Sequence, residues 1–347
     1  MKKIAIFNHK GGVSKTTTAF NIGWMLSKLD KRVLLVDADS QCNLTMMFLG
    51  NTAFDKFMSE NNTNNIMDAL APAFKGKPRP VVAIDCIENK RNKNLYLLPG
   101  SLDLTSYEVA LAMSFNFSDT LGVTANLPGA FSYLINKCCE KYDLDYAIID
   151  MNPSLSAINQ DLVLSSDYFF IPSSPDIFSL KAIQSLSRVL PKWETWARQA
   201  REVFKDADYP FTAKTPKFIG YTINDFNLGD KAQPAKSFKA IMDRISSEVT
   251  DNLVPALKNM QMLLPEETYN KTGALNKGLE NQSGSWDLFC LGQISNFNKL
   301  IAESNRKSIP VFELSFLHGY AGQIRTLKWF KRLFKVIAEK IIILTNE

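Results

Sequence analysis

The sequence predicts an α/β fold with a mainly parallel, twisted sheet flanked by helices. Short apolar runs typical of buried strands recur along the chain, and stretches with helical spacing lie between most of them. A glycine-rich turn follows the first run and opens the first helical stretch. Ligands of such folds bind at the carboxyl ends of the strands, so this turn is a candidate binding edge. The chain has 347 residues, 46% of them hydrophobic, which is ample for a large core.

The predicted strands are the apolar runs at residues 4–7, 33–36, 95–98, 146–149, 168–171, 218–223 and 311–314. The first predicted helix carries an apolar stripe at i, i+3, i+4 and i+7, formed by Ala19, Ile22, Gly23 and Leu26. Length alone suggests about two domains. The order of the motifs along the chain instead favours one elaborated domain over residues 1–347.

The turn FNHKGGVSKTTT at residues 7–18 predicts a phosphate-binding loop. Gly11 and Gly12 can take backbone angles that other residues avoid, so successive N–H groups can point at one anion. The helix that starts near Lys15 adds the positive end of its dipole. Lys15 is expected to reach the β- and γ-phosphates and the Thr16 hydroxyl to bind Mg²⁺. The expected nucleotide contacts are Gly11, Gly12, Val13, Ser14, Lys15, Thr16 and Thr17.

Carboxylates follow two other predicted strands. Asp37 and Asp39 lie at i and i+2, so they leave the strand end on the same face. One of them can orient Mg²⁺ through water and the other can position an attacking water. Asp150 ends the apolar run at 146–149 and is expected to bind a Mg²⁺-coordinated water, because Mg²⁺ takes few protein ligands. An aspartate at a strand end is often only a helix cap, but its place after the loop and the Asp37/Asp39 pair favours the metal.

These motifs together resemble the deviant Walker A motif and the later motifs of the ParA/MinD/Soj ATPases. The loop reads K-G-G-x-x-K-T from Lys10 to Thr16, and residues 36–45, 146–154, 167–180 and 303–314 resemble other family segments. The resemblance is closest to the ParA branch. It implies a P-loop ATPase fold that binds ATP and Mg²⁺ and forms an ATP-dependent homodimer. In that dimer Lys10 would reach the phosphates of the partner subunit.

The resemblance also assigns roles to three other residues. Asp39 would orient the hydrolytic water and Asp37 would support the metal shell. Asn224 aligns with the adenine-contacting position, where an amide can pair with the adenine edge, although a turn-forming asparagine is an equal alternative. Since no N-K-x-D motif follows a strand, ATP is favoured over GTP.

The sequence departs from the family pattern at several positions. In the usual P-loop, glycines stand at the positions of His9 and Ser14. Ser40 replaces the family's proline and Cys42 its common glycine. These changes leave the hydrolysis rate open. Three segments are expected to be additions to the family fold, at about residues 51–93, 191–216 and 251–291.

Residues 325–344 predict a basic amphipathic C-terminal helix. Its apolar stripe is Leu327, Phe330, Phe334, Ile337 and Ile341, and its candidate DNA-binding face is Arg325, Lys328, Lys331, Arg332 and Lys335. Three interpretations are open: a docked terminal helix with a solvated face, a phosphate-binding face, or a membrane-surface helix as in MinD. The stretch aligns with the last helix of the fold, which disfavours the membrane.

The overall composition of the chain disfavours several other classes of protein. A net charge of +5 permits contact with nucleic acid or an anionic membrane without requiring either. The five cysteines form no C-x-x-C pair and there are only two histidines, so no zinc pattern is present and a metal-cluster reductase is disfavoured. We expect a reducing, cytoplasmic compartment, no signal peptide and no membrane span.

The predicted function is that of a ParA-like ATPase. ATP and Mg²⁺ would build a dimer that binds double-stranded DNA without sequence preference, and a ParB-like or other partner protein would stimulate slow hydrolysis. The chain would then be nucleoid-associated when ATP-bound. The alternatives are a MinD-like ATPase at a membrane surface and a nucleotide-gated interaction module that barely hydrolyses ATP.

Overall fold

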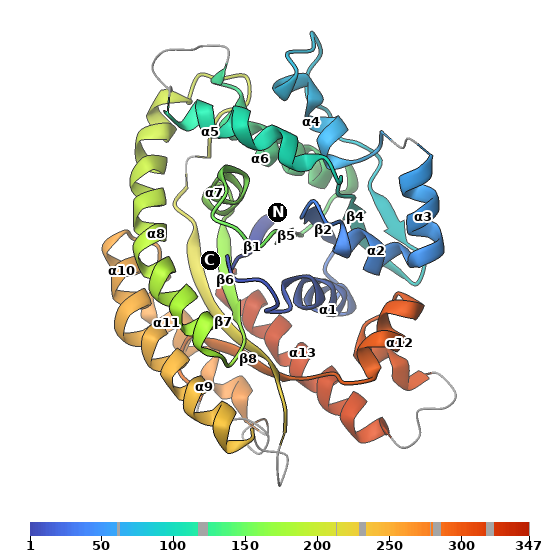
Figure 1. The fold of residues 1–347 in the computed structure, drawn as a ribbon, viewed down its shortest axis with the longest axis vertical. Coiled ribbons are helices and arrows are strands. Elements are labelled where there is room, and N and C mark those ends of the chain that lie inside the picture. The colour runs from blue at the N-terminus through green and yellow to red at the C-terminus, as the bar shows by residue number, and fades with distance from the viewer. Residues whose placement is uncertain are drawn as a thin grey trace.

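A computed structural model describes residues 1–60, 63–116, 124–212, 214–228, 234–277, 279, 286–316 and 323–346. Within them the fold centres on an eight-stranded sheet with the order β3-β4-β2-β5-β1-β6-β7-β8 (Figure 1). Every neighbouring pair is parallel except β3 and β4. The predicted α/β class with a mainly parallel sheet is confirmed. The strands are β1 Lys2–Ile6, β2 Val33–Ala38, β3 Ile87–Asn89, β4 Asn92–Leu98, β5 Tyr146–Met151, β6 Tyr168–Ser173, β7 Lys217–Phe226 and β8 Cys290–Ser295.

Helices cover both faces of the sheet because its central strands are apolar on both sides. Ile4 and Ile6 point into one core, with α1 and α13, whereas Ala5 and Phe7 point into the other, with α6, α7 and α8 (Figure 1). The helices are α1 Lys15–Lys28, α2 Asn43–Leu49, α3 Asn51–Ser59, α4 Ile66–Phe74, α5 Glu108–Asn116, α6 Leu127–Tyr142, α7 Ala157–Leu164, α8 Ile177–Val203, α9 Lys236–Glu248, α10 Val254–Asn259, α11 Glu266–Asn270, α12 Leu300–Lys307 and α13 Ile324–Leu344.

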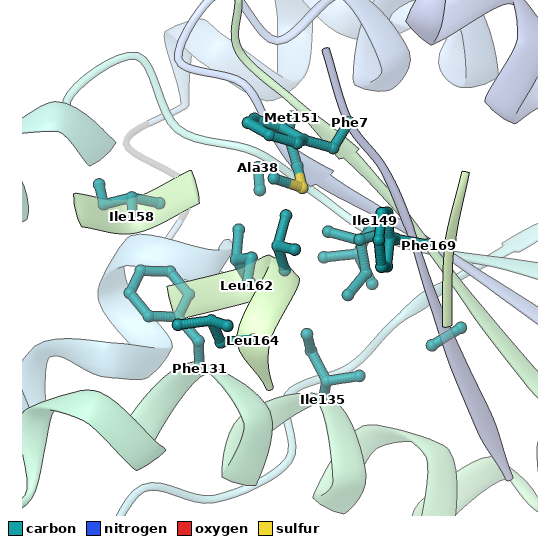
Figure 2. Close-up of a cluster of buried hydrophobic side chains, with 14 of the residues drawn as sticks. Phe7, Ala38, Phe131, Ile135, Ile149, Met151, Ile158, Leu162, Leu164 and Phe169 are labelled. Carbon is teal, nitrogen blue, oxygen red and sulfur yellow. The ribbon is translucent and has the colours of Figure 1, made fainter. Parts of the chain in front are cut away.

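Figure 2 shows part of the core on the second face. Phe131 and Ile135 of α6 lie with Leu162 of α7 beside Ile149 and Phe169 of the sheet, and all five side chains are buried. Burying a side chain of this size contributes about 1.5–3 kcal/mol to folding. This packing holds β5 and β6 rigidly, and the ends of these strands carry the residues discussed below.

The predicted strand at 311–314 is wrong. Residues Val311–Phe316 form a 3₁₀ helix, and its Val311, Phe312 and Leu314 side chains are buried in the core with α13. The last strand among the described residues is β8, at the end of the segment predicted as an addition. Gly292 and two polar residues in β8 weaken its strand signal. The glycine is needed there, because a Cβ at Gly292 would lie 2.5 Å from Ile337 Cδ1 on α13.

The three segments predicted as additions continue into the sheet and its helices. The first contains α3, α4 and the antiparallel edge strand β3. The second contains the last part of α8, which runs unbroken through Pro191 and buries Trp193 and Ala200. The third contains α10, α11 and the first residues of β8. That these segments are additions to a family fold remains a prediction.

Helix α13 docks on the sheet through its predicted apolar stripe. Leu327, Phe330, Phe334, Ile337 and Ile341 are all at most 1% exposed. The five basic residues predicted as a DNA-binding face are exposed on the same helix. None of the described helices is long and apolar enough to cross a membrane.

A sixth cation of α13, Lys340, is buried rather than exposed. Its Nζ donates to the carbonyl oxygens of Cys290 and Leu291 at 2.8 and 3.2 Å and lies 4.7 Å from the centre of the Trp286 ring. Burial lowers the pKa of Lys340 from 10.5 to about 8. The helix therefore carries one ammonium group whose charge is costly to keep in the folded state.

We expect this lysine to make stability depend on alkaline pH. Between pH 8 and 10.5 the unfolded chain keeps the Lys340 proton and the folded chain releases it, so the free energy of unfolding rises with pH in this window. The gain is about 3 kcal/mol at most. Urea denaturation across this range should show a smaller rise for Lys340→Met, whereas Lys335→Met, on the exposed face, serves as the control. Equal pH profiles for wild type and Lys340→Met would contradict the assignment.

Candidate nucleotide site

The loop between β1 and α1 forms one wall of a pocket of about 480 Å³. Gly12 and Ser14 both have left-handed backbone angles, with φ of 71° and 58°. This conformation is natural for glycine and strained for serine. All the predicted nucleotide-contacting residues from Gly11 to Thr17 line the pocket, so the structure brings them together at one cavity. Their contact with a nucleotide stays a prediction.

Lys15 lies at the base of this loop and is 7% exposed. Its Nζ donates to the carbonyl oxygens of Asn8 and Lys10 at 3.0 and 3.2 Å. Burial lowers the pKa of Lys15, and Asp150 opposes that shift. Of the described residues that line the pocket, Lys15 is the one cation, so it is the group available to pair with an anionic ligand.

Side chains from the neighbouring strands hold the loop from below. The amide nitrogen of Asn8 donates to Pro172 O at 2.8 Å, and Ser174 Oγ donates to Gly12 O at 3.3 Å. Asn224 is 1% exposed, and its amide nitrogen donates to Val13 O at 2.9 Å. Asn224 therefore lies behind the loop, where its donor is committed to the backbone. Asn224 is absent from the described pocket wall, and its contact with adenine stays a prediction.

Asp225, the next residue, does line the pocket. Its φ of 62° is also left-handed, and its Oδ2 accepts a hydrogen bond from the hydroxyl of Ser14. Ser14 stands where a usual P-loop has glycine, and this bond gives its hydroxyl a partner across the pocket wall. The departure at Ser14 thus keeps the loop geometry and adds a link to β7.

The three predicted carboxylates lie at the ends of the adjacent strands β2 and β5, where Asp37 pairs with Asp150 in register. Asp37 is fully buried, and its Oδ2 accepts from both the backbone N–H and the hydroxyl of Thr45, at 2.7 and 2.6 Å. These bonds tie α2 to the end of β2. Asp37 is not part of the pocket wall, so any support for a metal shell would be indirect.

Asp150 and Asp39 complete the polar end of the site. Neither carboxylate oxygen of Asp150 accepts a hydrogen bond of normal geometry from the described residues, although the Thr16 hydroxyl lies close enough to oppose the rise in its pKa. Burial, reinforced by the charge of Asp37, raises the pKa of Asp150 to about 8, and burial also raises the pKa of Asp37 to about 6. Asp39 lines the pocket, and its Oδ1 accepts the Gln41 N–H at 3.0 Å.

This donor set fits Mg²⁺. A buried carboxylate without hydrogen-bond donors is costly unless a cation or its water shell supplies them, and Mg²⁺ usually takes only one or two protein carboxylates. Within the described part of the chain, no cluster of three or more His, Cys, Asp or Glu residues could hold a metal. The Thr16 hydroxyl and Asp150 are therefore the residues that would hold the ion together with ligand phosphates.

Lys10 points away from the pocket. Its Nζ forms an ion pair with Asp176 Oδ2 at 2.9 Å, on the N-terminal cap of α8. The other oxygen of Asp176 accepts the backbone N–H groups of Phe178 and Ser179. The structure thus places Lys10 on the outer rim, beside the strongly exposed Phe178, rather than with Lys15.

Sequence reasoning missed Thr45, Asp176 and Asp225. Asp176 carries a recognisable signal, because an aspartate directly before a helical stretch is a common N-cap. Asp225 carries none, since it acts through Ser14, 211 positions away. Thr45 lies only eight positions after its partner Asp37, but a threonine in a helical stretch does not by itself indicate that contact. The predicted DNA face lies apart from the described pocket wall, and within it Arg332 donates to Lys277 O while Lys335 pairs with Glu339 at 3.6 Å.

Comparisons with known proteins identify relatives of this chain. A family model described as an AAA domain matches residues 1–200. The sporulation initiation inhibitor protein Soj of Bacillus subtilis is 31% identical over 185 residues, which cover 53% of this chain and 63% of Soj. The chromosome partitioning protein ParA of Caulobacter vibrioides is 28% identical over 198 residues, covering 55% and 63%. The chain thus matches less than two thirds of the length of these relatives.

The fold has a counterpart among solved structures. A complex of McdA from Cyanothece with ATP superposes with a TM-score of 0.56 at 18% identity, covering 98% of this chain and 96% of McdA. At this identity the likeness concerns the fold. It extends over almost the whole chain, including the segments predicted as additions.

Proposed function

Since the chain belongs to the ParA/Soj family of P-loop ATPases, we propose that it hydrolyses ATP to partition or position DNA or another cargo. One observation carries the proposal: a single pocket collects the phosphate loop, the cation Lys15 and the carboxylate Asp39, with the unpartnered Asp150 at the adjoining strand end. Positioning and charge stabilisation suffice for phosphoryl transfer, and this pocket supplies both.

Each residue has a task in the proposed reaction. The loop N–H groups and Lys15 bind and orient the phosphates, and Lys15 stabilises charge as it develops on them. Thr16 and Asp150 would hold Mg²⁺, and the ion would supply charge neutralisation to the bound phosphates. Asp39, fixed by the Gln41 N–H, orients the attacking water. Asp37 acts as a positioning residue, because it holds Thr45 and hence the start of α2.

The active form would be a homodimer in which Lys10 reaches the nucleotide of the other subunit. Its place on the rim supports this role, because a long flexible cation there can extend beyond its own subunit. Phe178, whose N–H donates to the Asp176 carboxylate that pairs with Lys10, is 72% exposed. A facing subunit would bury this side chain.

The ATP-bound dimer would bind duplex DNA and would release it when a ParB-like or other partner protein stimulates hydrolysis. The exposed basic face of α13 supports DNA over a membrane, since the apolar stripe that would have to insert into lipid is buried in the core. Contacts to phosphates alone give binding without sequence preference.

Light scattering tests the proposal. The mass of an Asp39→Ala protein should double when ATP and Mg²⁺ are added, and this dimer should take up random-sequence duplex. A monomer under all conditions would contradict the role of Lys10 and favour the interaction-module alternative. A dimer that ignores DNA but binds anionic liposomes would instead support the MinD-like alternative.

Replacing Asp176 should make dimerisation easier. Asparagine preserves the helix cap but removes the charge that holds Lys10 in its own subunit. An exposed ion pair of this kind contributes about 0.2–1 kcal/mol, so the ATP concentration for half-maximal dimerisation should fall about two- to fivefold in Asp176→Asn. Asp103→Asn, at an exposed aspartate before a 3₁₀ helix that it does not cap through its side chain, is the control for removing a surface charge. A higher ATP requirement in Asp176→Asn would show that the pair assists the dimer.

A further inference from the structure

A second hollow, of about 560 Å³, adjoins the nucleotide pocket at the C-terminal end of α2, where Asn51 lines both. Its walls are the corner between α2 and α3, the turn between β3 and β4, and the C-terminal end of α12. Figure 1 shows α2, α3 and α12 on the same side of the molecule, toward the end of the sheet where β4 is labelled. We call this hollow the β3-edge groove. None of its side chains has a role in the mechanism described above.

The β3-edge groove is strongly cationic. Lys90 and Arg91 line it from the β3–β4 turn, Arg306 and Lys307 line it from α12, and Glu88 is the one acidic residue of its wall among the described residues. Arg306 is paired with Glu303 on its own helix at 2.7 Å. Lys90 and Arg91 are exposed, and within the described residues they form no ion pair. Opposite walls of one groove thus present positive charge to the same space.

The shape of the groove depends on the close approach of the Gly50 backbone to Ser308. Gly50, between α2 and α3, has a φ of 82°, and a Cβ there would lie 2.7 Å from the hydroxyl of Ser308 at the end of α12. Glycine therefore allows the α2–α3 corner to meet α12. This contact brings the residues of the β3–β4 turn and of α12, more than 200 positions apart in the sequence, to one site.

We propose that the β3-edge groove binds the phosphodiester backbone of duplex DNA, in addition to the basic face of α13. The proposal rests on the proposed function and names a second contact surface for it. Lysine and arginine on facing walls match a ligand that carries repeated negative charge, and arginine can bind a phosphate through two N–H groups. Phe48 and Leu49 also line the groove, but the four basic residues around it favour a polyanion over an apolar protein helix.

Helix α2 connects this groove to the nucleotide. It begins at Asn43, directly after the segment that contains Asp39, and ends at Leu49. Its Met46 and Met47 line the nucleotide pocket, whereas Phe48 and Leu49 line the groove. A shift of this one short helix on nucleotide binding would therefore change both cavities. DNA affinity at the groove should depend on the nucleotide for this reason.

The test compares two double substitutions in the Asp39→Ala protein with ATP and Mg²⁺. Lys90→Gln with Arg91→Gln removes two charges from the groove, and Lys75→Gln with Lys77→Gln removes two exposed charges elsewhere. Binding to a fluorescent random-sequence duplex is titrated at several salt concentrations. The groove variant should bind about 10- to 100-fold more weakly at 0.1 M salt, and the slope of log affinity against log salt should fall by about 2. The control should bind as the parent does.

A second variant protects the test against a local folding defect. Arg306→Gln with Lys307→Gln alters the opposite wall and should weaken binding in the same direction. Light scattering must show an ATP-dependent dimer for each variant. If both groove variants keep the parent's affinity and slope while Lys331→Gln with Lys335→Gln loses affinity, the groove proposal is wrong and the proposed function stands. If the parent binds no duplex in any nucleotide state, both fail.

Discussion

A Lys15→Ala protein should bind ATP about 1,000-fold more weakly than the wild type, since charge-assisted hydrogen bonds contribute about 1.5–3 kcal/mol each and Lys15 would make two. Lys15 is the one cation among the described residues of the pocket wall, so no other side chain there can replace it. Its ammonium group already donates to two loop carbonyls, and phosphate oxygens would be better acceptors because they are charged.

Isothermal titration calorimetry with ATP and Mg²⁺ measures this effect. Lys28→Ala is the matched control, because Lys28 is on the same helix but pairs with Glu313 outside the pocket. Thermal unfolding of each variant shows whether the fold is retained. Equal ATP affinities for Lys15→Ala and Lys28→Ala would contradict the assignment of this pocket as the ATP site.

The phosphate-binding loop could be predicted because its sequence motif is local. The motif lies within six consecutive residues and consists of Gly11, Gly12, Lys15 and Thr16. Phosphate binding depends on the spacing of these residues rather than on contacts with distant parts of the chain. The convergence of the strand-end carboxylates Asp37, Asp39 and Asp150 could be predicted for a related reason. Parallel strands end at a common edge, so separate motifs at strand ends converge.

The parts that could not be predicted depend on contacts between distant residues. Asn224 sits 211 positions from its partner Val13, and the sequence alone does not show that the loop backbone takes its amide. The groove likewise joins segments far apart in the chain. The missed strand β8 has another cause, because the tight packing of α13 requires Gly292, a residue with low strand propensity.

The Asp39→Ala protein should hydrolyse ATP about 100- to 10,000-fold more slowly than the wild type, the usual range for losing a group that orients or deprotonates a nucleophile. Asp39 lines the pocket, and the Gln41 N–H fixes one of its oxygens, so the side chain is held in place before the reaction. Binding should change little, because a carboxylate does not attract phosphates. The variant should therefore accumulate as the ATP-bound dimer.

Steady-state phosphate release, measured with the stimulating partner absent, gives the rate, and calorimetry gives the affinity. Asp39→Asn separates the two ways in which the carboxylate can act. Asparagine can still accept the Gln41 N–H and orient a water, but it cannot take a proton. A rate for Asp39→Asn near that of the wild type would identify orientation as the main role, whereas a rate as low as that of Asp39→Ala would identify proton transfer. Wild-type hydrolysis by both variants would mean that Asp39 has no role in hydrolysis, and the attacking water would then have to be positioned by another group.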